Sequence, residues 1–102
     1  MNDKFAVIWT ENAISDLLAI KEFIAQDSAN RATAWISELY RAGLSVADFP
    51  ERGRIVPEFN KKDLRELLIE NYRLVYRIKK STIEILTVFD GHRQLSKKDI
   101  KK

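Results

Sequence analysis

The chain has 102 residues, of which 45% are hydrophobic and ten are aromatic, and this is enough for one domain with a packed core. This composition excludes wholesale disorder, and the absence of cysteine excludes a disulfide framework and thiolate metal sites. No apolar stretch approaches the roughly 20 residues of a membrane span, and no apolar signal segment follows the first residues. The sequence therefore predicts a cytoplasmic protein rather than a secreted or membrane protein.

The net charge of +3 conceals an asymmetry between the two halves of the chain. Residues 1–50 contain four Lys or Arg and seven Asp or Glu, a balance of −3. Residues 51–102 contain fourteen and eight, a balance of +6. Such a split is typical of a surface that meets a polyanion or an acidic partner, although an ordinary solvated surface is the alternative.

The first half of the chain predicts one strand followed by two helices. Residues 5–9 form a short apolar run of β-favouring types, which indicates a buried strand. Thr10 can cap a helix over about residues 11–26, where apolar residues recur at helical spacing. The polar segment 27–30 then begins a second amphipathic helix that ends before Pro50. Such a short connection predicts two antiparallel helices that pack together.

The second half predicts a loop and three strands. The loop covers residues 50–63, which contain both prolines of the chain. The strands cover residues 64–70, 72–79 and 82–89. In the second of these, apolar and mainly basic side chains alternate, which predicts one face against the helices and one in water. The third is apolar at both parities, as expected for a strand inside the sheet.

The predicted order is β-α-α-β-β-β, an α+β fold with two antiparallel helices packed on one face of a mainly antiparallel four-stranded sheet. The other face of the sheet is expected to be partly open. Residues 1–95 are expected to form the single domain, and residues 96–102 a basic C-terminal tail that is free to fray.

Four arginines are candidates for a common binding surface. Arg73 and Arg77 are four residues apart on one strand, so they are predicted to project from the same side. Arg65 can lie opposite or diagonal to them, and Arg93 follows the last strand. Such a cluster suits phosphate or carboxylate groups. The alternative is a solvated strand face whose charge is offset by acidic neighbours.

His92 is the only histidine, and it follows a glycine at the end of a strand. This is an accessible place for a group that titrates near neutral pH, so it is a candidate general acid or base, or an ordinary surface residue. A lone histidine without cysteines or spaced carboxylates makes no ligand set. The sequence therefore predicts neither a metal site nor a cofactor.

The remaining candidates are interpreted as structural. Tyr72 and Tyr76 have apolar neighbours, which predicts core tyrosines whose hydroxyls reach a partner, with base stacking as the alternative. Gly53, between Arg52 and Arg54, is a turn glycine, and a single glycine ahead of a strand gives little support for nucleotide binding.

Over about residues 5–95, the sequence resembles the RelE/ParE superfamily of type II toxins. Five segments carry the resemblance in order: Ala13–Ile24, Phe49–Glu58, Leu64–Leu67, Tyr72–Ile78 and Ile83–Arg93. The resemblance implies a growth-inhibiting, plasmid-stabilising toxin that a cognate antitoxin holds inactive in a hetero-oligomer. The antitoxin is expected to contribute an acidic, partly apolar segment.

The superfamily divides by target, and this sequence resembles ParE more than RelE. RelE-like members cut messenger RNA on the ribosome with a basic cluster, whereas ParE-like members poison DNA gyrase. Arg73 and Arg93 match arginines of the RelE-like active surface, and other ribonuclease members carry a histidine near His92. The paired lysines expected at Leu64–Leu67 are missing, however, and Asp99 lies near the place of the C-terminal tyrosine of RelE.

The resemblance therefore implies a gyrase inhibitor, with a ribosome-dependent endoribonuclease as the alternative and a binding module without toxicity as a third possibility. The residues expected to bind the target or the antitoxin are Arg52, Arg54, Arg65, Arg73, Arg77 and Arg93. The residues expected to be catalytic in a ribonuclease are Arg73, Arg77, His92 and Arg93. Both sets require the guanidinium groups to converge on one exposed patch.

Overall fold

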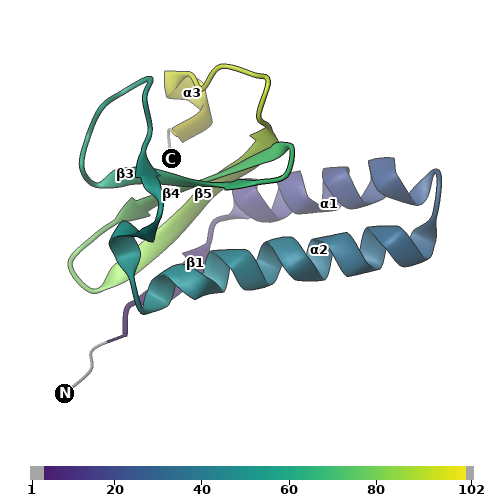
Figure 1. The fold of residues 1–102 in the computed structure, drawn as a ribbon, viewed down its shortest axis with the longest axis horizontal. Coiled ribbons are helices and arrows are strands. Elements are labelled where there is room, and N and C mark those ends of the chain that lie inside the picture. The colour runs from purple at the N-terminus through teal and green to yellow at the C-terminus, as the bar shows by residue number, and fades with distance from the viewer. Residues whose placement is uncertain (1–3, 101–102) are drawn as a thin grey trace.

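The computed structural model describes residues 4–100, and it contains two long helices packed against a five-stranded sheet (Figure 1). The elements in chain order are β1 (Ala6–Trp9), α1 (Glu11–Ala25), α2 (Ala29–Leu44), β2 (Arg54–Ile55), β3 (Leu64–Ile69), β4 (Tyr72–Ile78), β5 (Thr82–Asp90) and α3 (Lys97–Ile100). The predicted helices and strands are confirmed to within one or two residues at each end, except that α2 ends at Leu44 and a short 3-10 turn, Ser45–Ala47, follows it where the helix was expected to continue toward Pro50. Strand β2 and helix α3 are additions to the predicted elements. Within residues 4–100, neither long helix has the length and apolarity needed to cross a bilayer.

The strands are arranged in the order β1-β5-β4-β3-β2. Strand β1 runs parallel to β5 and every other pair is antiparallel, so the mainly antiparallel sheet is confirmed. The predicted number of four strands is one too low, because the two-residue strand β2 pairs with β3 inside the predicted loop. Strand β5 lies inside the sheet, as its apolar residues at both parities indicated.

Both long helices begin at capping side chains and pack antiparallel on the same face of the sheet (Figure 1). The hydroxyl of Thr10 accepts a hydrogen bond from the amide of Ala13 at 3.2 Å. The hydroxyl of Ser28 accepts one from the amide of Arg31 at 3.2 Å. The helices and the sheet enclose a first core, whose fully buried members include Leu39.

A carboxylate on α1 fastens this helix to an irregular point of the sheet. The ladder between β4 and β5 contains a bulge, at which Leu86 is the extra residue of β5. The Asp16 carboxylate accepts hydrogen bonds from the Thr87 hydroxyl at 2.5 Å and from the Val88 amide at 3.0 Å. The helix therefore supplies acceptors where the bulge interrupts the regular ladder.

Tyr76 ties the loop before β2 to the first core. Its side chain is fully buried, and its hydroxyl donates to the Pro50 carbonyl at 2.6 Å and accepts from the Gly53 amide at 2.9 Å. A Cβ atom at Gly53 would lie 2.6 Å from the Glu66 carbonyl oxygen, so only glycine permits this approach. The prediction of a core tyrosine with a bonded hydroxyl is confirmed for Tyr76.

The second face of the sheet carries a core of its own, so the predicted open, wet face is wrong. In Figure 1 the loop before β3 and the segment after β5 cover the sheet on the side away from α1 and α2. The buried members of this second core are Val56, Leu64, Val75, Leu86, Phe89 and Leu95. The alternation of apolar and basic side chains along β4 predicted that this face is exposed to water. The loop before β3 and the segment after β5 cover it instead.

The C-terminal segment is part of this cover. Leu95 is 4% exposed, and Ile100 of α3 packs against the second core. The predicted tail at 96–102 thus begins with a short helix, Lys97–Ile100, and residues 101–102 of that tail lie outside the described residues.

Candidate functional site

Three of the predicted site residues line one cavity of about 270 Å³ at the end of the β3–β4 hairpin. Arg54 comes from β2, Arg73 from β4, and His92 from the turn after β5. The β3–β4 turn, Glu70-Asn71, also lines this cavity. Because β2, β3, β4 and β5 are consecutive neighbours in the sheet, residues distant in sequence meet here.

The Arg73 side chain borders the cavity but is almost completely enclosed by protein atoms. Arg73 is 6% exposed, and its Nε donates to Glu66 Oε1 at 2.7 Å. Its two terminal nitrogens donate to the Glu58 carboxylate at 2.7 and 2.8 Å. The hydrogen bonds from Arg73 lower the pKa of Glu58 to about 2, and Glu58 in turn raises the pKa of Arg73. The guanidinium charge is therefore compensated inside the protein.

The same pair of side chains holds the C-terminal segment against the sheet. Arg73 donates to the Arg93 carbonyl at 3.1 Å, and Glu58 accepts from the Leu95 amide at 2.9 Å. The Arg93 guanidinium lies 4.5 Å from the centre of the Phe89 ring and 3.2 Å from the Asp99 carboxylate. These contacts give Arg73 and Arg93 structural partners that the sequence did not indicate.

Arg54 shares one of these carboxylates. Its Nε lies 2.6 Å from Glu66 Oε2, and the Glu66 side chain is completely buried between Arg54 and Arg73. Two arginines and two glutamates, including Glu58, thus form one network with no net charge. The predicted positive patch is neutral at this place, because two glutamates from neighbouring segments fold onto it.

His92 forms a pair with Asp90 at the mouth of the cavity. Its Nδ1 lies 2.8 Å from Asp90 Oδ1, and its backbone amide donates to the same oxygen, which lowers the pKa of Asp90. The imidazole is 86% exposed. A carboxylate–imidazole pair can orient a proton acceptor. Within residues 4–100, no group of three or more His, Asp or Glu side chains is placed to hold a metal ion.

The other predicted arginines lie elsewhere, so the expected convergence of the arginine side chains is wrong. The two-residue turn between β3 and β4 sets the register that pairs Arg65 with Tyr76, so Arg65 lies on the helix side of the sheet. There the Arg65 guanidinium donates to the Gly53 carbonyl at 3.0 Å. Arg77 shares the face of Arg73 but lies at the opposite end of β4. Arg52 is exposed in a short helical turn before β2.

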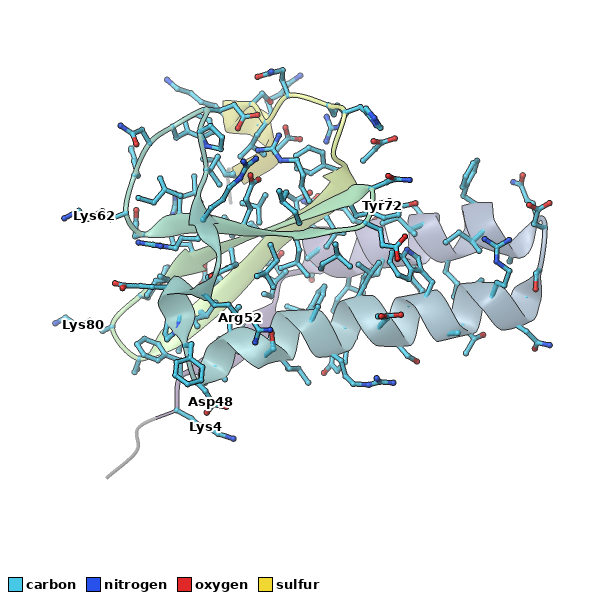
Figure 2. All side chains as sticks on the ribbon, viewed as in Figure 1. Lys4, Asp48, Arg52, Lys62, Tyr72 and Lys80 are labelled. Atoms are coloured by element: carbon cyan, nitrogen blue, oxygen red, sulfur yellow. The ribbon has the colours of Figure 1, made fainter. Side chains whose placement is uncertain are left out.

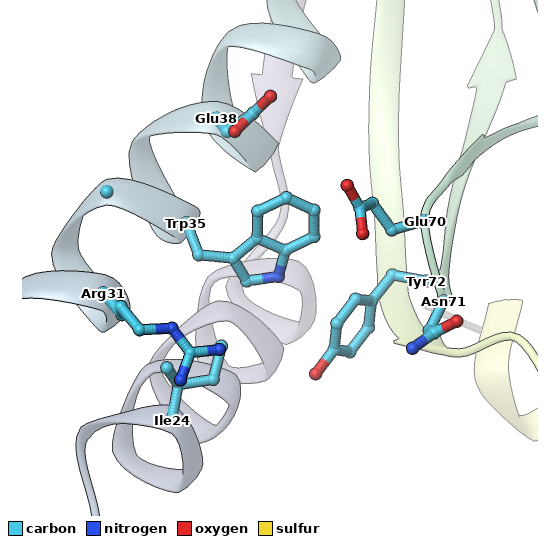
Figure 3. A pocket seen from close by; sticks show the side chains of 8 residues that line it. Ile24, Arg31, Trp35, Glu38, Glu70, Asn71 and Tyr72 are labelled. Carbon is cyan, nitrogen blue, oxygen red and sulfur yellow. The ribbon is translucent and has the colours of Figure 1, made fainter. Parts of the chain in front are cut away.

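A second cavity, of about 450 Å³, lies between α2 and the β3–β4 turn (Figure 3). The rings of Trp35 and Tyr72 form its floor, with their centres 6.1 Å apart. The carboxylate of Glu70 faces the Trp35 ring, whereas Glu38 lies further along α2 and Arg31 lies on the side of Ile24 (Figure 3). The apolar neighbours of Tyr72 predicted a core residue, whereas Tyr72 and Trp35 are both only partly buried and leave this cavity open between them.

Glu70 has a backbone φ of 53°, in the left-handed region that disfavours most side chains. Replacing Glu70 with Asn, which tolerates this conformation, is expected to raise the free energy of unfolding by about 0.5–1 kcal/mol. Asn71→Gly in the same turn is the control, and it should lower stability because Asn71 does not have a positive φ. Urea denaturation measures both effects, and an unchanged or less stable Glu70→Asn variant would contradict the argument.

Comparisons with known proteins show the family and the fold of this chain. The family model described as "ParE toxin of type II toxin-antitoxin system, parDE" matches residues 7–95. "Toxin RelE2" from Caulobacter vibrioides is 34% identical over 83 residues, which cover 80% of this chain and 90% of that protein. The solved structure "Chromosomal ParDE TA system from P. aeruginosa" has a similar fold, with a TM-score of 0.73 at 20% identity over 86% of this chain and 97% of that one.

Proposed function

Because the chain belongs to the ParE family and is the toxin of a type II toxin–antitoxin system, we propose that it inhibits DNA gyrase until a cognate antitoxin neutralises it. The observation that supports this choice of target is that Arg73 is buried and bonded to two glutamates. A nuclease needs cations that are free to approach a phosphate in the transition state. Arg73 instead has its charge compensated by Glu58 and Glu66. A toxin that binds its target requires no such set of exposed groups.

Exposed apolar side chains support an antitoxin as partner. Phe23 and Phe49 are each 69% exposed, Leu18 is 59% exposed and Leu68 is 56% exposed. Apolar groups that are contiguous on a surface are typical of sites that another protein covers, whereas scattered ones are ordinary. The antitoxin is expected to bury some of these side chains. Its binding would place the toxin in a hetero-oligomer.

The test of the gyrase proposal is a supercoiling assay with relaxed plasmid, ATP and purified gyrase. Toxin freed from its antitoxin is expected to reduce supercoiling in proportion to its concentration. Prior addition of equimolar antitoxin is expected to restore supercoiling, and the antitoxin alone is the control. Unchanged supercoiling with the folded toxin in large excess would contradict the proposal.

Ribosome-dependent cleavage of messenger RNA is the second candidate function. It is favoured by the pairing of Asp90 with His92 beside a cavity that Arg54 also lines. A general acid or base contributes about 10²–10⁴-fold to a rate, so His92→Ala should remove cleavage in a translating extract if this candidate is correct. Under the gyrase proposal, neither the natural chain nor His92→Ala should cleave transcripts.

A further inference from the structure

Six basic residues lie at one end of the sheet, with Arg65 and Arg77 on opposite faces of it, and this group is called the basic end below. Its members are Lys61, Lys62, Arg65, Arg77, Lys79 and Lys80. The turn before β3 and the turn between β4 and β5 meet there, because the Ile78 amide donates to the Asp63 carbonyl at 2.8 Å. Figure 2 shows Lys62 and Lys80 projecting from the same side of the molecule.

Most of this charge is not compensated locally. Asp63 and Glu84 are the acidic residues of the same two turns and strand ends. Together with the six basic residues they give a net charge of +4, which is larger than the net charge of +3 of the whole chain. The ion pairs they form are long, at 3.6 Å to Arg77 and 3.4 Å to Lys79. Among residues 4–100, the Nε of Arg77 is a buried donor without a hydrogen-bond acceptor.

The backbone that carries these charges is held in place. The Leu64 amide donates to the Lys61 carbonyl at 3.1 Å, and the Lys79 amide donates to the Thr82 carbonyl at 2.8 Å. Arg65 Nε donates to the Lys62 carbonyl at 2.9 Å. Little ordering of the main chain would therefore be needed when a ligand binds.

The chemistry of the basic end distinguishes between kinds of partner. Protein interfaces are built around apolar and aromatic side chains and are depleted in lysine. Two large exposed apolar side chains border the basic end: Phe49 shares a pocket with Ile78, and Ile8 pairs with Glu84. The other large exposed apolar residues belong to α1, α2 and β3: Ile14, Leu18, Phe23, Tyr40, Leu44 and Leu68. A group in which lysines and arginines outnumber such apolar side chains instead suits the regularly spaced phosphates of a nucleic acid.

We propose that the basic end binds the phosphodiester backbone of duplex DNA without reading its sequence. The choice of duplex DNA rests on the proposed function, since gyrase acts on duplex DNA. Weak binding here, added to contacts with gyrase elsewhere, would raise the effective concentration of toxin where gyrase holds its DNA.

The experiment is a titration of a fluorescein-labelled DNA duplex with antitoxin-free toxin, followed by anisotropy at salt concentrations from about 50 to about 200 mM. Four to six phosphate contacts predict a slope of log K against log salt of about −4 to −5. The variant Lys61→Gln/Lys62→Gln/Lys80→Gln removes three charges from the basic end. Its slope is expected to be shallower by about 2.7 and its affinity much lower at every salt concentration.

The matched control removes the same total charge from the two long helices, as Lys21→Gln/Arg31→Gln/Arg41→Gln. This variant should keep the slope of the natural chain. Equal weakening by both triple variants would overturn the proposal, because only net charge would then matter. Tighter binding to single-stranded RNA than to the duplex would also overturn it, as would equal affinity for poly-glutamate. The titration contains no gyrase, so its failure is separate from a failure of the supercoiling assay.

Discussion

Arg73→Ala is expected to lower the free energy of unfolding by about 3–5 kcal/mol. The substitution leaves the Glu66 carboxylate, whose side chain is completely buried, with only the half-exposed Arg54 as an ion-pair partner. It also removes the donors to Glu58 and to the Arg93 carbonyl, which hold the C-terminal segment over the second core. Removing one partner of a buried ion pair is costly because the remaining charge stays in a medium of low polarity.

Urea denaturation followed by circular dichroism measures this loss, with Arg93→Ala as the matched control. Arg93 is half exposed and interacts with Phe89 and Asp99, so its removal is expected to cost at most about 1 kcal/mol. Similar stability of the two variants would contradict the structural role given to Arg73. A folded Arg73→Ala protein that lost only activity would indicate an exposed, functional arginine instead.

The second large effect is expected in acid. The pKa of Glu58 falls from its ordinary value of 4.5 to about 2 in the folded chain, mainly because Arg73 donates hydrogen bonds to it. The ionised carboxylate therefore stabilises the fold at every pH above about 4.5. This stabilisation is lost as the pH falls from about 4.5 to about 2, where Glu58 takes up a proton in the folded state. The loss through this one group amounts to at most about 3 kcal/mol.

The measurement is the free energy of unfolding at a series of pH values for the natural chain and for Glu58→Gln. Glu58→Gln is expected to be less stable at neutral pH, and its disadvantage should shrink as the pH falls through 4.5. Glu22→Gln, at an exposed position of α1, is the control for removing a glutamate without such contacts. A constant difference between the natural chain and Glu58→Gln down to pH 2 would contradict the argument.

Local patterns in the sequence were sufficient for most of the fold and for the family. Helical spacing and the caps at Thr10 and Ser28 define α1 and α2, and the superfamily resemblance is confirmed by the family match over residues 7–95. Strand β2 was missed because two residues give no periodicity. The covered face was missed because Val56 and Leu95 lie in segments whose spacing is irregular, so nothing local shows where they pack.

The candidate site was harder to predict, for two physical reasons. The face on which Arg65 lies depends on the pairing register, and the two-residue turn at Glu70-Asn71 fixes that register with Arg65 opposite Tyr76. Applying this rule to the predicted strands would have separated Arg65 from Arg73. The partners of Arg73 could not be found in this way, because Glu58 is fifteen residues away in a loop without regular pairing.

The parallel pairing of β1 with β5 also has a consequence for how the chain is made. Ala6 pairs with Thr82 and Trp9 with Ile85, so the first strand must wait for the last one to be synthesised. A nascent chain that ends before residue 82 has the helical hairpin but lacks the strand that both β1 and β4 require. Such distant pairings form late. During translation the sheet therefore stays incomplete until residues 82–90 have been synthesised.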